Sequence, residues 1–201
     1  MGTKFNTAVF ICLFLLFSFN IAFGQLMTMK VSKSLCSDKN SYFLEVEIKK
    51  NGKLLDSSGR KDYDYSNIYR LDDSVKIKII EELLYFTSDT SLCCSEVKAY
   101  DNIDYPGCFN EIPSAKRLSV RVEALFIINR VAYNSFTYRI GCYPVLYDSE
   151  TKREINNDNC LINIMIERYR EWFRMYKKTG KLPDYQFLNE GRIRWWGKHL
   201  K

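Results

Sequence analysis

The chain has 201 residues, of which 46% are hydrophobic and 27% are charged, with nine glycines and four prolines. This composition excludes disordered, collagen-like and proline-rich proteins and is ordinary for a globular domain. The single histidine, His199, excludes most zinc sites, Ser-His-Asp triads and Cys-His dyads.

An apolar segment follows the N-terminus. Lys4 is its only cation, and the residues from Ala8 to Phe19 are almost all apolar. This block is shorter than the roughly 20 residues that span a bilayer, and Ala22 and Gly24 place small residues before a cleavage site. We therefore predict that residues 1–24 are a cleaved signal peptide. The alternative is an uncleaved N-terminal anchor.

Cleavage would leave residues 25–201, which are 177 residues and enough for one domain with a sizeable core. Positive charge is concentrated at the C-terminal end of this domain. The stretch from Gln25 to Cys160 has 19 basic and 20 acidic residues, whereas Leu161 to Lys201 has 10 basic and 4 acidic residues. Any basic surface is therefore expected to come from the last fifth of the chain.

The first regular element is predicted at Ser41–Lys49, where apolar and charged residues alternate. Asn51-Gly52 follows, a dipeptide typical of a type I′ turn, and Lys53–Leu55 can return as the second strand of a hairpin. The face expected to be buried consists of Tyr42, Leu44, Val46 and Ile48. Residues 56–64 are polar and are predicted to form a loop.

Two segments in the middle of the chain have ambiguous patterns. Ser74–Phe86 alternates like a strand at first, but its acidic start and the spacing of its later apolar residues favour a helix. A second helix is predicted after Pro113-Ser114, with a strand at Leu118–Ile128 as its rival. The apolar stripe of that helix would be Leu118, Val122, Leu125, Ile128 and Ala132. Residues 87–107 are predicted to be a loop with room for a short strand.

The strongest pattern belongs to an amphipathic helix at Asp158–Thr179. Asn157 or Asp158 can cap its start, and Gly180 can end it. Before it, Phe136–Tyr147 is aromatic and interrupted by Gly and Pro, which favours one edge strand or two short ones. Together the elements predict an α+β fold, a single compact domain with a short antiparallel sheet and two or three helices.

Six cysteines follow the predicted signal peptide: Cys36, Cys93, Cys94, Cys108, Cys142 and Cys160. An even number in an exported chain indicates disulfide bonds. Because adjacent cysteines rarely pair, we predict that Cys93 or Cys94 pairs with Cys108, and that Cys142 pairs with Cys160. Buried free thiols are the alternative.

The C-terminal region combines cations with tryptophans and is the candidate surface for binding a partner. Its candidate residues are Arg170, Arg174, Lys178, Arg192, Arg194, Trp195 and Trp196. Adjacent tryptophans on a strand point to opposite faces, so one is expected in the core and the other exposed or covered by a partner. The plainer alternatives are a solvated helix face and a terminal strand that completes the core.

Catalytic groups are scarce. The paired carboxylates, Asp72-Asp73, Glu81-Glu82 and Asp101 with Asp104, show no sign of facing one another across a cleft as a glycosidase requires. The chain has no phosphate-binding loop, nucleophile elbow or metalloprotease motif, so we expect no enzyme, no metal and no cofactor.

These observations predict an exported, periplasmic or secreted binding protein of the bacterial envelope. The absence of an Asn-x-Ser/Thr sequon among 14 asparagines favours a bacterial origin. The most concrete form is a protein that recognises another protein, as an inhibitor or a toxin-neutralising immunity protein does. Export argues against nucleic acid, and no membrane span is expected after cleavage. The alternatives are a carbohydrate or small-ligand binding domain and a hydrolase of envelope polymers.

Overall fold

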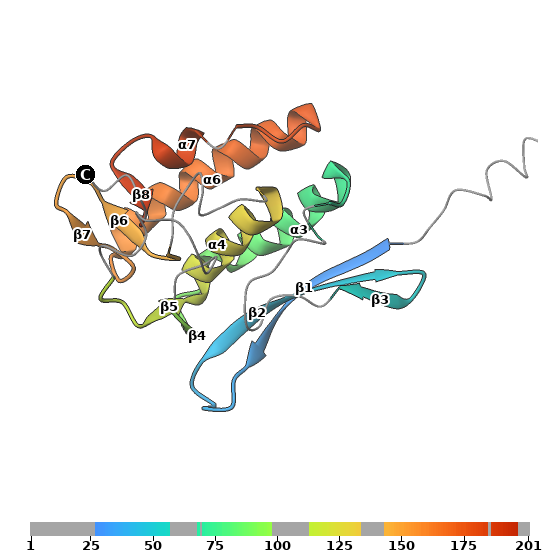
Figure 1. The fold of residues 1–201 in the computed structure, drawn as a ribbon, viewed down its shortest axis with the longest axis horizontal. Coiled ribbons are helices and arrows are strands. Elements are labelled where there is room, and N and C mark those ends of the chain that lie inside the picture. Colours follow the sequence, from blue (N-terminus) through green and yellow to red (C-terminus); the bar gives the residue numbers. More distant parts are fainter. Residues whose placement is uncertain are drawn as a thin grey trace, which may run out of the picture.

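The computed structural model describes residues 27–56, 68, 70–97, 113–133, 143–184 and 186–196. Three helices of thirteen or more residues pack with two small sheets, and α3 and α4 lie between the first sheet and α6 (Figure 1). The α+β class predicted from the sequence is confirmed. The predicted signal peptide lies outside the described residues.

The first sheet has five strands in the order β1-β2-β4-β5, and β3 pairs with β2. The strands are β1 (Met27–Leu35), β2 (Tyr42–Lys50), β3 (Lys53–Asp56), β4 (Leu92–Glu96) and β5 (Arg117–Ser119). β1 and β2 are antiparallel along their whole length, with Val31 opposite Val46. β2 and β4 are parallel, with Tyr42 opposite Cys93. The sheet is therefore mixed, where the sequence predicted an antiparallel one.

The predicted hairpin is confirmed in β2 and β3. Asn51 and Gly52 have φ angles of 52° and 76°, which is the left-handed backbone that both central positions of a type I′ turn require. On the predicted inner face, Leu44, Val46 and Ile48 are buried and Tyr42 is half-buried. The period-two pattern of this strand therefore predicts correctly which of its faces is buried.

β1 is an edge strand, and a carboxylate of α3 lies at its free edge. Glu82 of α3 accepts a hydrogen bond from the backbone N–H of Val31 at 2.5 Å. Lys33 donates to Asp89 at 2.5 Å and to Ser91 at 3.0 Å, and its ammonium also lies over the Tyr42 ring. The Glu82 contact satisfies a backbone donor that an edge strand otherwise offers to another chain.

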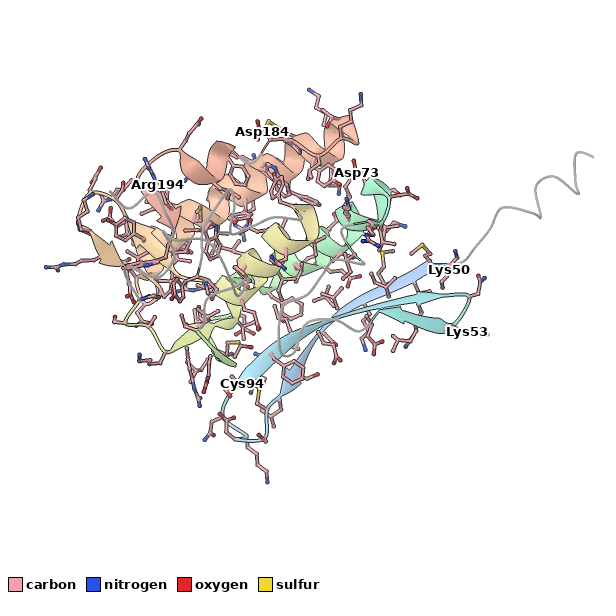
Figure 2. All side chains as sticks on the ribbon, viewed as in Figure 1. Lys50, Lys53, Asp73, Cys94, Asp184 and Arg194 are labelled. Carbon is pink, nitrogen blue, oxygen red and sulfur yellow. A yellow bond between two sulfur atoms is a disulfide. The ribbon has the colours of Figure 1, made fainter. Side chains whose placement is uncertain are left out.

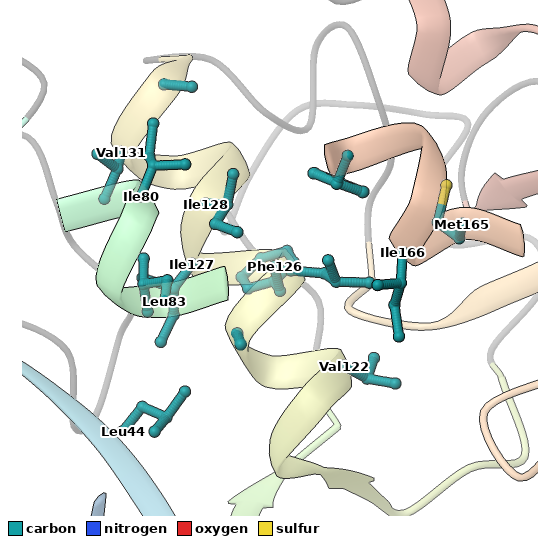
Figure 3. Close-up of a cluster of buried hydrophobic side chains, with 14 of the residues drawn as sticks. Leu44, Ile80, Leu83, Val122, Phe126, Ile127, Ile128, Val131, Met165 and Ile166 are labelled. Atoms are coloured by element: carbon teal, nitrogen blue, oxygen red, sulfur yellow. The ribbon is translucent and has the colours of Figure 1, made fainter. Parts of the chain in front are cut away.

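α3 (Asp73–Tyr85) and α4 (Val120–Ala132) confirm the two helices predicted in the middle of the chain. α3 runs directly into a short 3-10 turn, η1 (Phe86–Ser88). The predicted stripe of α4 is buried, but so are the residues around it, and Figure 3 shows these side chains among those of α3 and α6. A helix that is buried on all sides is the centre of the core. Leu118 itself belongs to β5, so α4 begins two residues later.

Glu123 is the buried acid of α4 and connects that helix to the first sheet. Its carboxylate accepts hydrogen bonds from the backbone N–H of Leu44 and the hydroxyl of Ser95, both at 3.0 Å. Leu44 and Ser95 belong to β2 and β4, whose parallel pairing is limited to Tyr42 and Cys93. Glu123 therefore supplies polar contacts just beyond the point where this backbone pairing stops.

α6 (Asn159–Thr179) is the predicted amphipathic helix, with its predicted caps. The side chain of Asp158 accepts from the backbone N–H groups of Cys160 and Leu161 at 3.0 Å, and Gly180 ends the helix with a φ of 65°. None of the described helices, α6 included, is long and apolar enough to cross a membrane.

The Asp158 cap gives a first testable expectation. Asp158→Ala should lower the free energy of unfolding by about 1 kcal/mol, because two N–H groups at the start of α6 lose their acceptor. Urea denaturation followed by circular dichroism would measure the change. Asn157→Ala is the matched control, since Asn157 is exposed and precedes the cap. Equal losses in the two variants would contradict a capping role.

The second sheet has the order β7-β6-β8 and lies beside the first half of α6 (Figure 1). Its strands are β6 (Leu146–Asp148), β7 (Arg153–Glu154) and β8 (Ile193–Trp195), and the short helix α7 (Gln186–Asn189) precedes β8. Both pairings are antiparallel. β6 confirms a short strand at the end of the predicted 136–147 segment, of which residues 136–142 lie outside the described residues.

A disulfide joins Cys36 to Cys94, so the prediction of disulfide bonding is confirmed and the predicted pairings are corrected. Cys93 and Cys160 carry free thiols, so neither the pairing of Cys93 or Cys94 with Cys108 nor that of Cys160 with Cys142 is formed. Burial raises the pKa of the Cys93 thiol well above its usual range, and the nearby Glu123 carboxylate raises it further. Cys93 is thus the buried thiol that the sequence left as an alternative.

Candidate functional site

The structure divides the predicted partner-binding residues into two groups. Arg170, Arg174 and Lys178 lie on the outer face of α6, whereas Arg192, Arg194, Trp195 and Trp196 lie on or beside β8. Figure 2 shows Arg194 at one end of the molecule, far from Asp73, whose backbone carbonyl accepts a hydrogen bond from Tyr176 near the C-terminal end of α6. The seven residues therefore do not form one continuous patch.

Trp195 belongs to the core, which corrects its assignment to a binding surface. It is 2% exposed, and its indole lies edge-to-face with Phe126 at 5.8 Å between ring centroids. Its Nε1–H donates to the Tyr169 hydroxyl at 2.8 Å, and that hydroxyl donates to the side-chain oxygen of Asn129 at 2.6 Å. This places β8 as the terminal strand that completes the core, which was the plainer alternative.

Trp196 points to the other face of β8, as predicted for adjacent tryptophans. Its ring is half-buried and lies edge-to-face with Tyr147 at 5.4 Å. Its backbone N–H donates to the carbonyl of Val145 at 2.7 Å, which extends the pairing of β8 beside β6. Trp196 therefore packs on the second sheet and leaves only part of its surface to solvent.

The cations of the β8 group make contacts within the fold. The Arg192 guanidinium donates to both carboxylate oxygens of Asp148, at 2.8 and 2.7 Å, and pairs with Glu150 at 3.0 Å. Arg194 donates from Nε to the carbonyl of Gly191 at 2.8 Å. Arg168 of α6 donates to the carbonyls of Glu190 and Ile193, so it fixes the turn before β8 against the helix.

The Asp148–Arg192 pair predicts how stability depends on pH. Hydrogen bonds from Arg192 hold the pKa of Asp148 below its ordinary value of 3.8, so the ionised pair stabilises the fold above that value. As the pH falls below 3.8, the unfolded chain binds the proton first and this stabilisation is lost. Urea midpoints of the wild type and Asp148→Asn should therefore differ most at neutral pH and converge in acid. A difference that does not change with pH would contradict this assignment.

Arg170, Arg174 and Lys178 lie on the part of α6 that packs beside α3. Two contacts show the relative direction of the two helices. Lys177 pairs with Glu81 at 2.6 Å, and Arg170 donates to the Thr87 hydroxyl at 3.4 Å. As residue numbers rise along α6 they fall along α3, so the two helices are antiparallel. Arg174 lies between these two contacts on α6, at the level of the last turns of α3.

Tyr85 and Lys78 of α3 were not among the predicted site residues, yet they belong to this surface. Tyr85 is 77% exposed, the highest value among the exposed large hydrophobic residues, and it lies between Glu81 and Thr87. Lys78 is exposed on the same stripe of α3. The sequence could have indicated that Tyr85 is exposed, because Tyr85 does not lie on the apolar stripe of Ile79, Leu83 and Phe86. We call Lys78, Tyr85, Arg170, Arg174, Lys177 and Lys178 the α3–α6 face.

Several cations of this face make no ion pair with any residue that the structure describes. Arg170 pairs with Glu167 and Lys177 with Glu81, but within the described part of the chain Lys78, Arg174 and Lys178 make no ion pair. Surface cations that are unpaired and beside an exposed aromatic ring are available to a partner, and tyrosine and arginine are the residues most enriched at interface hot spots.

A polar groove of about 850 Å³ lies at the N-terminal end of α6. It is lined by Ser114, Ala115, Lys116, Glu154, Asn156, Asn157, Asp158, Asn159 and Cys160, and none of these is aromatic. The two carboxylates of the groove accept hydrogen bonds from backbone N–H groups. Asp158 caps α6, and Glu154 accepts from the N–H groups of Ser114 and Ala115. The stacking platform expected of a carbohydrate site is therefore missing from the groove lining.

The carboxylate pairs identified in the sequence serve separate elements. Glu81 pairs with Lys177 of α6, whereas its neighbour Glu82 binds the edge of β1. Asp72 precedes α3 as its cap residue, and Asp73 lies in its first turn. Asp101 and Asp104 lie outside the described residues. The described members of these pairs thus do not converge on one cleft.

Comparison with known proteins gives no relative for this chain: no family model matches it, and no significant match is found among curated proteins or solved structures.

Proposed function

We propose that this protein is exported to the bacterial envelope and acts without catalysis by binding another protein through the α3–α6 face. The single observation that supports this most is the combination of Tyr85, which is 77% exposed, with Lys78, Arg174 and Lys178, which make no ion pair within the described residues. A large exposed aromatic ring contributes little to stability, whereas it buries substantial apolar area when a partner covers it.

The charge pattern of α6 favours a protein over a membrane or a polyanion. Glu167 and Glu171 are exposed on the same side of α6 as Arg170 and Arg174. A uniformly negative polymer or a layer of anionic headgroups would be repelled by these acids when it lies along the helix. A protein can place cations opposite the glutamates and carboxylates opposite the arginines, so mixed charge gives specificity.

Export is supported by the apolar N-terminal segment and by the Cys36–Cys94 disulfide, because such bonds persist in oxidising compartments. Binding by occupation of a partner's surface is how inhibitors and toxin-neutralising immunity proteins act. We propose that this protein belongs to the same group.

The test is a crosslinking pull-down from envelopes of cells that produce the protein. The wild type is compared with Arg174→Glu/Lys178→Glu, and the matched control is Lys50→Glu/Lys53→Glu. The control makes the same charge change at the tip of the β2–β3 hairpin, which lies away from α6 (Figure 2). We expect one protein to be recovered by the wild type and the control and lost with the α6 variant.

The recovered protein is then purified, and its dissociation constant is measured for each variant. We expect an increase of about tenfold or more for the α6 variant, which corresponds to about 1.4 kcal/mol, and little change for the control. Equal recovery by all three proteins would refute the α3–α6 face as the binding surface. Recovery of glycans or phospholipid in place of a protein would refute the proposed function.

A further inference from the structure

We propose that Cys160 forms a mixed disulfide with a small amino-acid or peptide thiol, one that carries both carboxylate and ammonium groups. The polar part of this thiol lies in the groove at the N-terminal end of α6. This site is separate from the α3–α6 face, whose α6 residues belong to the second half of the helix. It starts from a cysteine that the proposed function does not use.

Among the described cysteines, Cys160 alone combines a free thiol with an exposed side chain. Cys93 also has a free thiol, but it is buried. In an exported chain, a cysteine left without a partner is available for bonding to another molecule. Cys160 lines the groove, and the groove volume of about 850 Å³ is within the range of small-molecule sites. The groove therefore has room for a molecule bonded to Cys160.

A buried amide of the groove points independently to a ligand. Asn156 lines the groove although it is only 5% exposed. Its Oδ1 accepts a hydrogen bond from the backbone N–H of Leu146 at 2.7 Å, but its Nδ2 donates to no acceptor among the described residues. Buried donors in native proteins nearly always have an acceptor. A carbonyl or carboxylate group of a molecule in the groove can supply one.

The charges around the groove favour a ligand with charges of both signs. Lys116 lines the groove, and Arg121 of α4 donates to the side-chain oxygen of the lining residue Asn159 at 2.5 Å. Neither cation forms an ion pair with any residue that the structure describes, although Arg121 is only 5% exposed. A buried cation is costly without a counter-charge, so these two favour a carboxylate on the ligand. The lining carboxylates of Glu154 and Asp158 favour an ammonium group elsewhere on the same molecule.

The bond forms by thiol–disulfide exchange. Cys160 gives its proton to water, and its thiolate attacks one sulfur of the disulfide form of the small thiol. The S–S bond of the small molecule breaks as the bond to Cys160 forms. The other half leaves as a thiolate and takes up a proton from water. One disulfide replaces another, so the step needs no further oxidant.

The test incubates the protein with oxidised glutathione and follows the mixed disulfide at Cys160 by peptide mapping and mass spectrometry. Cystamine is the comparison, because this disulfide carries ammonium groups but no carboxylates. A capped peptide of residues 157–163 gives the reference rate of each disulfide with the same cysteine outside the fold. Relative to this peptide, we expect the protein to prefer glutathione over cystamine by about tenfold.

The variants separate the groove from the thiol. Lys116→Glu should abolish the preference for glutathione, whereas Lys53→Glu makes the same change at another exposed lysine and should keep it. In NMR spectra of isotope-labelled protein, the side-chain amide signals of Asn156 should shift when glutathione is bonded to Cys160. They should stay unchanged in Cys160→Ser treated in the same way.

Absence of a mixed disulfide at Cys160 would overturn the proposal. A disulfide between two copies of the chain, formed through Cys160 in preference to the mixed disulfide, would overturn it too. Equal normalised rates for glutathione and cystamine, or a preference that Lys116→Glu leaves intact, would show that Cys160 is an exposed thiol without a binding groove. The proposed function is unaffected by any of these outcomes.

Discussion

Trp195→Ala should lower the free energy of unfolding by about 3–5 kcal/mol, which is the range for truncating a buried tryptophan. The side chain is 2% exposed, packs on Phe126, and donates to the buried Tyr169 hydroxyl. Its removal leaves a cavity and takes one partner from the Tyr169–Asn129 chain. Because small domains are stable by about 5–15 kcal/mol, such a variant is expected to be partly unfolded at modest urea concentration.

Trp196→Ala is the matched control for this prediction. Trp196 is half-buried on the opposite face of β8, so its truncation should cost clearly less than that of Trp195. Both variants are measured by urea denaturation followed by circular dichroism. The reverse order of the two losses would show that Trp195 is not a core residue in solution and would restore it as a candidate for partner binding.

Loss of the disulfide is the second large effect. Cys36 and Cys94 are separated by 58 residues, and closing a loop of that length removes about 4 kcal/mol of unfolded-chain entropy in the chain-entropy account. Cys36→Ser/Cys94→Ser should therefore destabilise the protein by about that amount, and the wild type in a reducing buffer should approach the same urea midpoint.

Cys160→Ser is the control that replaces a cysteine without removing a disulfide bond. Cys160 is exposed and its thiol is free, so the substitution should change stability by no more than about 0.5 kcal/mol. A large loss in Cys160→Ser, together with no effect of the reducing buffer on the wild type, would contradict the Cys36–Cys94 assignment.

Much of the fold was predictable because strong local patterns agree with the tertiary contacts. α6 has a continuous apolar stripe and two caps, and the β2–β3 hairpin has its turn dipeptide between alternating strands. β1 was not predicted, although Met27, Met29 and Val31 alternate with polar residues. This alternation begins only a few residues after the predicted cleavage site, where the start of the domain was not expected to be a strand. Only its pairing with β2 makes the segment a strand.

The candidate site was harder to predict, since burial is decided by tertiary packing. Charge and aromatic content pointed to the C-terminal region, but a tryptophan in the core and one on the surface have the same composition. Trp195 is enclosed by α4 and α6, which lie far from it in the sequence. Tyr85 was not predicted because it lies far from the α6 cations in the sequence. Only the contact between α3 and α6 brings it onto the same surface.

The hydrogen bond from Val31 to Glu82 also bears on the order in which the chain folds. β1 and β2 are close in sequence and can pair early, whereas α3 follows β1 by dozens of residues. Until α3 docks, the outer edge of β1 has no carboxylate beside it and can pair with the same edge of another molecule. We therefore expect slow docking of α3 on the β1–β2 pair to lower the yield of refolding at high protein concentration.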